Sequence, residues 1–229
     1  MAPLVWLRTR HDATPLTTTL TLYLVLAVVR VAGAYGLPFM VLSLVLTPCV
    51  LLVLPRSRWA EAGLRPASNS RLALGLTLVV AVYVAVIAAN TAAFGLSRDN
   101  WTTGIPTMFR QLASASAAVA AVLMVVAMGL VVPALEEVCY RGALFIAVER
   151  IAGTATAITL TSVGWALVHV GNYGLIPFNP AVLAGVLPSV FCMGLALGIC
   201  RTITGSCVAS FVAQGVANLL LVGWLSVVF

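Results

Sequence analysis

The chain has 229 residues, of which 62% are hydrophobic and only 8% are charged. Soluble domains carry about 25% charged residues, so this composition excludes an ordinary soluble fold. Twelve arginines, no lysine and six acidic residues give a formal net charge of +6. Because the arginines lie mainly near the ends of apolar runs, they indicate anchoring at the membrane–water boundary and exclude a nucleic-acid-binding face.

Apolar runs of about 20 residues, enough to cross a hydrocarbon core of about 30 Å, follow one another along the chain. Residues 1–15 form a short N-terminal segment without a signal-peptide cleavage site, and residues 16–54 are predicted to form two transmembrane helices. A polar connection over residues 55–71 opens a membrane domain that is predicted to occupy residues 55–229. Its six predicted helices cover residues 72–96, 112–132, 133–152, 154–170, 181–200 and 206–229.

The arginines predict which side each connection faces. Arg8 and Arg10 share a side with the four arginines of residues 55–71 if two helices separate them, and the positive-inside rule makes that side cytoplasmic. Eight helices return the C-terminus to the cytoplasm and place residues 133–141 and 169–180 near the cytoplasmic face. The sequence therefore predicts an all-α integral membrane protein with about eight transmembrane helices and cytoplasmic termini. The absence of lysine beside frequent alanine, valine and arginine suggests a bacterial cell membrane.

Three of the six acidic residues fall in residues 136–149, inside or beside apolar sequence, where carboxylates are costly and indicate function. Glu137 and Arg141 are four residues apart on a predicted helix, so they share a face and are expected to pair. Glu136 points about 100° away and is predicted to face a cavity, where it can act as a base. The structural alternative is that both glutamates pair with Arg141 and Arg150 to hold helices together.

Three further polar side chains lie in apolar sequence. His169 ends the run WALVH, and the amides of Gln214 and Asn218, one turn apart, share a helix face. The functional interpretation is a histidine beside the base and amide N–H groups that face an oxyanion. The structural alternatives are a hydrogen-bonded histidine at a helix end and amides that bond between helices. The five cysteines lie in apolar sequence without a C-x-x-C pair, so neither a disulfide framework nor a zinc site is predicted.

These motifs, in this order and spacing, resemble the CAAX-protease and bacteriocin-processing family of intramembrane glutamic endopeptidases, which includes the type II CAAX prenyl endopeptidases. EEVCYR, from Glu136 to Arg141, matches the motif E-E-x-x-x-R. WALVH, ending at His169, resembles F-x-x-x-H, and the last run resembles a motif ending H-x-x-x-N. The resemblance covers roughly residues 55–229, and its specific part is in residues 133–220.

The resemblance implies a cavity open to the cytoplasmic side, with no metal and no other cofactor. Glu136 would be the general base that activates water, His169 would orient or deprotonate that water, and Asn218 would stabilise the oxyanion. Glu137 and Arg141 would support the helix. The implied partners are membrane lipids and a peptide or lipidated protein substrate, cleaved near the cytoplasmic face by direct attack of water.

Two positions depart from the family pattern. Trp165 replaces a phenylalanine, and Gln214 stands where the family has its second histidine. Glutamine still offers N–H donors for an oxyanion, but it cannot ionise, and one intramembrane histidine does not make a two-histidine metal site. The alternative to an enzyme is therefore an inactive relative that binds a membrane peptide as an immunity factor or scaffold. A proton-coupled transporter ranks last, because no pair of Gly/Pro-interrupted segments repeats between the two halves.

Overall fold

The computed structural model describes residues 59–113 and 116–229, together with single positions between residues 17 and 56. Within this part of the chain the regular secondary structure is helical and contains no strand. The predicted N-terminal segment of residues 1–15 lies outside the described residues, as do most positions of the two helices predicted in residues 16–54. Those predictions stay predictions, whereas the all-α fold is confirmed for the rest.

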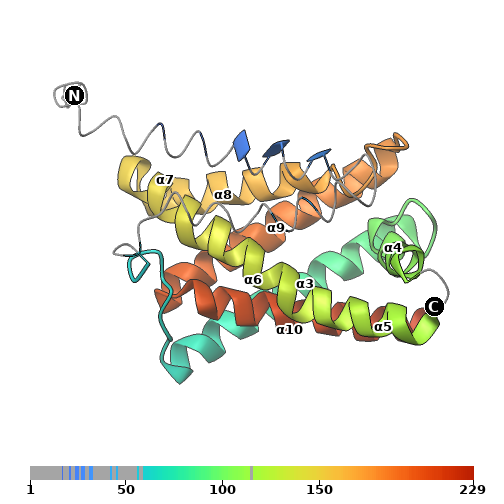
Figure 1. Ribbon diagram of the computed structural model, residues 1–229, viewed down its shortest axis with the longest axis horizontal. Coiled ribbons are helices and arrows are strands. Elements are labelled where there is room, and N and C mark those ends of the chain that lie inside the picture. The colour runs from blue at the N-terminus through green and yellow to red at the C-terminus, as the bar shows by residue number, and fades with distance from the viewer. Residues whose placement is uncertain are drawn as a thin grey trace.

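The helices run back and forth along the long axis of the molecule (Figure 1). In chain order the elements are α3 (Asn69–Phe94), a 3-10 turn (Trp101–Thr103), α4 (Gly104–Leu112), a long helix from Ala117 to Ala152, α8 (Thr154–His169), α9 (Pro180–Thr204) and α10 (Cys207–Val228). Among the described residues, four helices are long and apolar enough to cross a membrane: α3, the long helix, α9 and α10. Helix α8 has only 16 residues.

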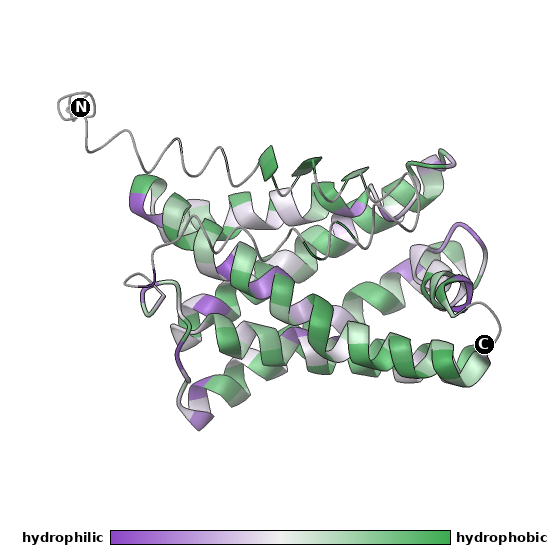
Figure 2. Cartoon of the chain, viewed as in Figure 1, coloured by the Kyte–Doolittle hydropathy of each residue, from purple (hydrophilic) through white to green (hydrophobic). Residues whose placement is uncertain are grey.

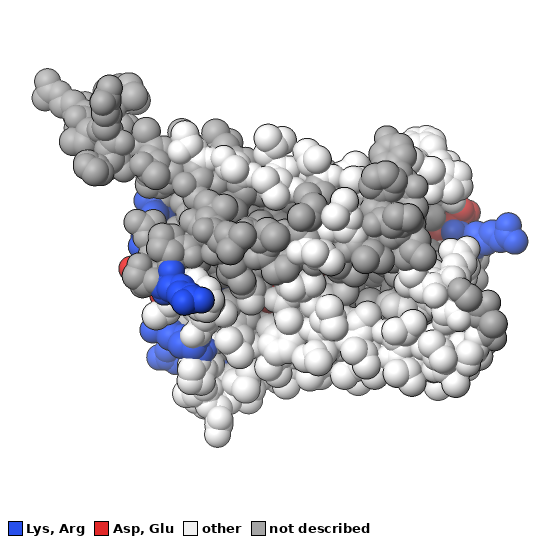
Figure 3. Space-filling view, viewed as in Figure 1, with Lys and Arg blue, Asp and Glu red and all other residues white. Residues whose placement is uncertain are grey.

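The surface between the two ends of the bundle is apolar. Figure 2 shows hydrophobic residues along the outer faces of the helices, and Leu74, Val122 and Leu220 are each more than half exposed. Figure 3 shows charged side chains gathered at the two ends of the long axis. An apolar belt between two charged ends matches the cross-section of a bilayer, so the chain is an integral membrane protein.

Residues 117–152 form one helix of 36 residues, where the sequence predicted two. Its three α-helical stretches are joined by two π-helical turns: α5 (Ala117–Val126), the turn Ala127–Val131, α6 (Val132–Glu137), the turn Val138–Leu144 and α7 (Phe145–Ala152). In the first turn the N–H of Val132 donates to the carbonyl of Ala127, five residues back. The prediction that a new helix starts at Pro133 is wrong, because the π-turn lets the helix continue through a residue that lacks an N–H.

One long helix in place of two changes which connections share an end of the bundle. At one end, the N–H of Cys207 donates to the carbonyl of Gly63 at 2.9 Å, and Arg150 pairs with Glu61. We call this the arginine end and define it by residues 59–68, Arg150 and Gly205.

At the opposite end, the Asn179 amide donates to Asp99 at 3.0 Å. We call this the loop end and define it by residues 97–103 and 170–179. Helix α10 starts at the arginine end, so the C-terminus lies at the loop end (Figure 1). The helix count that placed residues 169–180 and the C-terminus beside the arginine-rich connection is therefore wrong. Residues 133–141 lie in the interior of the long helix rather than at that connection.

Small residues allow α9 to pack closely on α8. A Cβ added at Gly194 would lie 2.9 Å from the Cβ of Ser162, and one added at Gly198 would lie 3.0 Å from a methyl of Ile158. Glycines four residues apart on one face allow such close helix packing in membranes. This contact places the end of α8, with His169, against the interior of the bundle.

A second close approach brings α10 against the long helix. A Cβ added at Gly215 would lie 2.5 Å from the carbonyl oxygen of Gly129, and one added at Gly129 would lie 2.8 Å from Leu219. The two backbones are therefore in contact at the first π-turn. Because Gln214 and Asn218 flank this contact, it sets their distance from the long helix.

We predict that Gly215→Ala lowers the thermal unfolding temperature of the purified protein in detergent. The added methyl meets a backbone carbonyl that cannot rotate away, and overpacking of this kind costs about 1–3 kcal/mol. Gly223→Ala, also in α10 but with open space at its Cβ, is the matched control and is expected to unfold at or above the wild-type temperature. Equal unfolding temperatures for the two variants would show that the α10 contact is not tight.

We also predict that single cysteines at exposed Arg71 and exposed Arg98 react from opposite sides of the membrane. A cysteine appended after Phe229 should react from the same side as the one at residue 98. The measurement is labelling of intact cells by a membrane-impermeant maleimide, before and after permeabilisation. Labelling of residue 71 and the C-terminus from one side would restore the eight-helix count and contradict the fold.

Candidate active site

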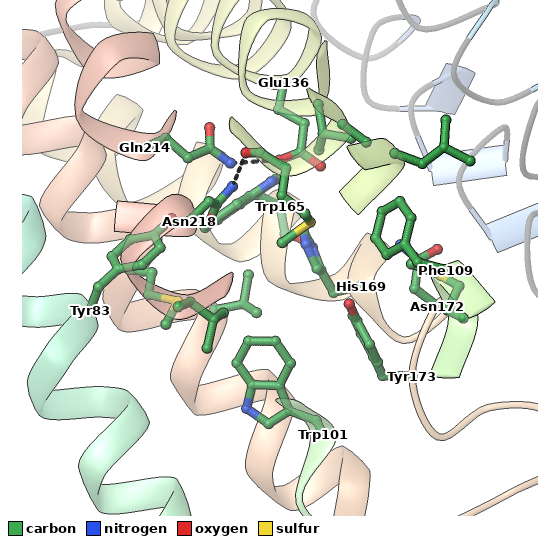
Figure 4. Close-up of a pocket in the computed structure, with 18 of the residues that line it drawn as sticks. Tyr83, Trp101, Phe109, Glu136, Trp165, His169, Asn172, Tyr173, Gln214 and Asn218 are labelled. Carbon is green, nitrogen blue, oxygen red and sulfur yellow. Dashed lines mark hydrogen bonds between the residues drawn. The ribbon is translucent and has the colours of Figure 1, made fainter. Parts of the chain in front are cut away.

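A cavity of about 320 Å³ lies among the helices, between Glu136 in the interior of the bundle and Trp101 and Tyr173 at the loop end. All four residues predicted to be catalytic line it, and Figure 4 shows their side chains around it. They come from three helices: Glu136 from α6, His169 from α8, and Gln214 and Asn218 from α10. Most of the remaining wall is apolar or aromatic: Tyr83, Trp101, Met108, Phe109, Leu112, Leu123, Ala127, Met128, Val132, Trp165, Asn172, Tyr173, Val190, Met193 and Leu221.

The predicted pair of Glu137 and Arg141 is present, with 2.7 Å between Oε1 and Nη1. Both side chains are fully buried. The Arg141 guanidinium also donates to the carbonyl of Gly194 at 3.0 Å and lies 4.7 Å from the ring centre of Trp165. These contacts tie the long helix to α8 and α9, so they set its rotation and direct the adjacent Glu136 into the cavity.

Glu136 accepts a hydrogen bond from Gln214, with 2.8 Å between Nε2 and Oε2. Each of the two side chains is only 2% exposed. A bond from an amide to an ionised carboxylate is stronger than one between neutral groups, and burial strengthens it further. Gln214 therefore positions the carboxylate of Glu136, a role that the sequence did not predict for it.

Asn218 donates from Nδ2 to the carbonyl oxygen of Met128 at 2.9 Å. That carbonyl needs an external donor, because the N–H of Val132 goes to Ala127 and Pro133 has no N–H. One N–H of Asn218 thus makes a hydrogen bond between helices, which was the structural alternative for the amides. An amide nitrogen carries two hydrogens, and the second remains for an acceptor in the cavity.

His169 is half-buried at the end of α8, where its Nδ1 lies 2.7 Å from the carbonyl oxygen of Trp165. A carbonyl can only accept, so Nδ1 carries a proton, and in the neutral imidazole Nε2 is then the acceptor nitrogen. The second ring nitrogen therefore has the lone pair that a base or a water-orienting group requires.

A row of aromatic rings lines the cavity, and the sequence did not predict it. Tyr173 stacks on His169 with ring centres 6.4 Å apart, and Trp101 meets Tyr173 edge-on at 5.4 Å. Trp165 meets His169 edge-on at 4.9 Å. The spacing of Trp165, His169 and Tyr173, four residues apart each time, was a signal for part of this row.

No spacing in the sequence indicated that Trp101 would join this row. Its position depends on a buried polar cluster around the neighbouring Asn100. Asn100 accepts from Asn90 of α3 at 2.5 Å and from Thr102 at 2.7 Å, and donates to the carbonyl of Gly95 at 2.6 Å. These bonds join the connection after α3 to the helix itself. The cluster thereby closes the loop end of the cavity with an indole ring.

The chemistry of the cavity follows from its contents. A buried carboxylate, an imidazole with an acceptor nitrogen and two amides face one apolar space. Within the described part of the chain, no three His, Cys, Asp or Glu side chains lie close enough together to hold a metal ion. Such a set can take a proton from water and donate to an oxygen that gains charge, which is what hydrolysis of a carbonyl compound needs.

Comparison with known proteins places these helices in a family. Residues 118–220 match the family described as "Type II CAAX prenyl endopeptidase Rce1-like". No curated protein and no solved structure gives a significant match. The matched segment runs from α5 into α10, and it contains every motif on which the resemblance in the sequence depends. The segment that matches the type II CAAX prenyl endopeptidase Rce1-like family, residues 118–220, thus contains Glu136, His169, Gln214 and Asn218, which line one cavity.

Proposed function

We propose that the protein is an intramembrane endopeptidase that cleaves a membrane-associated or lipidated peptide with a water molecule activated by Glu136. Family membership implies protease activity in general. The observation that carries the specific proposal is a buried carboxylate that receives a hydrogen bond from Gln214 and faces an apolar cavity. An apolar enclosure strengthens the electrostatic effect of each polar group inside it.

In the proposed reaction, the water oxygen attacks the carbonyl carbon of the scissile peptide bond while one water proton passes to Glu136. The carbonyl oxygen becomes an oxyanion, to which the second N–H of Asn218 donates. Once the new carbon–oxygen bond has formed, the hydroxyl that keeps the second water proton donates to Nε2 of His169, which orients the tetrahedral intermediate. Glu136 then returns its proton to the amide nitrogen, the carbon–nitrogen bond breaks, and an amine and a carboxylic acid leave.

The wall of the cavity supports an apolar substrate. Met108, Phe109 and Leu112 from α4 and Val190 and Met193 from α9 all line the space. A lipid chain or a transmembrane peptide segment would bury apolar surface here, which is favourable by about 25 cal/mol per Å². Either kind of molecule reaches the site through the membrane, and the wall does not favour one over the other.

The second candidate function is a peptide-binding immunity factor or scaffold without catalysis. The observation in its favour is that one N–H of Gln214 and one of Asn218 are engaged within the protein, by Glu136 and by Met128. The two candidates differ in what Glu136 does, because a binding role tolerates a neutral isostere of the carboxylate.

We predict that Glu136→Gln lowers kcat by about 10²–10⁴, the usual contribution of a general base. The assay is cleavage of quenched-fluorescence peptides, prenylated and unmodified, by purified protein in detergent. Glu149→Gln is the control, because Glu149 accepts from Thr154 outside the cavity and should leave cleavage within about twofold. Retention of full cleavage by Glu136→Gln would exclude the mechanism, whereas retention of a cellular function without any cleavage would favour the binding role.

The corrected helix count also supports a proposal for the orientation of the site. Arg65 and Arg150 belong to the arginine end, Arg201 donates to the carbonyl of Glu61 there, and Arg56 and Arg71 flank residues 59–68 in the chain. Arg98 and Arg110 follow α3 towards the loop end. The positive-inside rule then assigns the arginine end to the cytoplasm. We therefore propose that the loop end and the C-terminus face the opposite side, in place of the cytoplasmic opening and cytoplasmic C-terminus predicted from the sequence.

This orientation has its own expected result. A C-terminal alkaline phosphatase fusion should be active and a C-terminal green fluorescent protein fusion dark in bacterial cells. The reverse pattern would put the loop end in the cytoplasm and would show that the charge distribution does not govern this chain.

A further inference from the structure

We propose that Trp165 and Gln214 form the binding site of the nucleophilic water on Glu136, with the Trp165 indole N–H as a water-positioning donor. This proposal rests on the proposed function, because it names the groups that hold the water of that reaction. It gives Trp165 a role beyond packing, since a phenylalanine at this position would supply the same ring without a donor.

Four buried polar atoms in the described part of the cavity wall lack a hydrogen-bond partner, one each on Tyr83, Trp101, Trp165 and Gln214. The last two are of opposite kind. The indole Nε1 of Trp165 is a donor and the amide Oε1 of Gln214 is an acceptor. Both side chains are 2% exposed, and both line the cavity. A buried polar atom without a partner costs about 1–3 kcal/mol, so a bound molecule that satisfies both atoms is favoured.

The two atoms lie beside Glu136. Figure 4 shows the Trp165 indole next to the paired side chains of Gln214 and Glu136. The nitrogen of an amide is about 2.3 Å from its own oxygen, given bond lengths of about 1.23 and 1.33 Å. Because Gln214 Nε2 is 2.8 Å from Glu136 Oε2, Gln214 Oε1 lies no more than about 5 Å from that carboxylate oxygen. One water can donate to both, because two O–H···O bonds of about 2.75 Å that meet near the tetrahedral angle join acceptors about 4.5 Å apart.

The bonding capacity of water matches this site. The water donates one hydrogen to Glu136 and the other to Gln214 Oε1, and its oxygen accepts from the Trp165 N–H. Three tetrahedral positions are then occupied by protein, and the remaining lone pair is directed into the cavity, towards the substrate carbonyl. When that lone pair forms the new carbon–oxygen bond, the proton on the Glu136 side passes to the carboxylate, and the other stays on the new hydroxyl.

Arg141 keeps the indole in place for this role. Its guanidinium lies over the Trp165 ring, and the ring edge contacts His169. Both contacts use the ring and neither uses the N–H. The substitution Trp165→Phe therefore removes the donor while keeping a ring for both contacts.

The first test reads the water directly and does not depend on activity. The protein is labelled with ¹⁵N at its tryptophan indoles, in nanodiscs, and the Trp165 resonance is assigned by its loss in Trp165→Phe. We expect a cross-peak between the Trp165 indole N–H and bound water in the wild type, and its loss in Gln214→Met. No water cross-peak, or a cross-peak unchanged in Gln214→Met, would overturn the proposal.

The second test uses cleavage. Trp165→Phe should lower kcat about 100-fold, because the water loses a positioning donor and misplacement of a reacting group has an effect of this size. KM should be unchanged. Trp224→Phe, in α10 but outside the wall of this cavity, is the control and should cleave like the wild type. Wild-type rates for Trp165→Phe would overturn the role of the N–H. If the wild type shows the water cross-peak but cleaves no peptide, the water site is supported and the proposed protease function is contradicted.

Discussion

A carboxylate in the interior of an apolar helix bundle is unstable unless donors surround it, and the hydrogen bond from Gln214 to Glu136 supplies one at 2.8 Å. The bond requires α10 and the long helix to touch, which Gly129 and Gly215 permit because neither has a side chain at the contact. It also requires the long helix to keep its rotation, which the buried pair of Glu137 and Arg141 maintains. The cavity exists because these constraints hold together.

The first π-turn connects the path of the long helix to the polar wall of the cavity. It carries the helix through Pro133 and leaves the carbonyl of Met128 without a donor from its own helix. Asn218 supplies that donor from α10. A side chain of α10 thus supplies the hydrogen bond that the Met128 carbonyl lacks within its own helix. Such a bond is expected where no water is present to satisfy a carbonyl. This bond places an amide with a second N–H beside Glu136.

The composition and the motifs predicted the membrane fold, the family, the pair of Glu137 and Arg141, and the residues that meet at the cavity. They did not predict the single long helix. A proline after a span of sufficient length is typical of a helix start, and the π-turn that accommodates Pro133 leaves no pattern in the residue types. The error reversed the predicted side of every later connection. The bond from Gln214 to Glu136 and the enclosure by Trp101 were also beyond reach, because both depend on how separate helices pack.

We propose that this cavity hydrolyses peptide bonds in the membrane. The most direct test of this proposal is a comparison of protein N-termini, by mass spectrometry, in membranes of host cells that carry either the wild-type chain or Glu136→Gln at equal abundance. We expect new N-termini, within or next to transmembrane segments, that appear only with the wild-type chain. Identical sets of N-termini from the two strains, with both proteins folded and inserted, would contradict it.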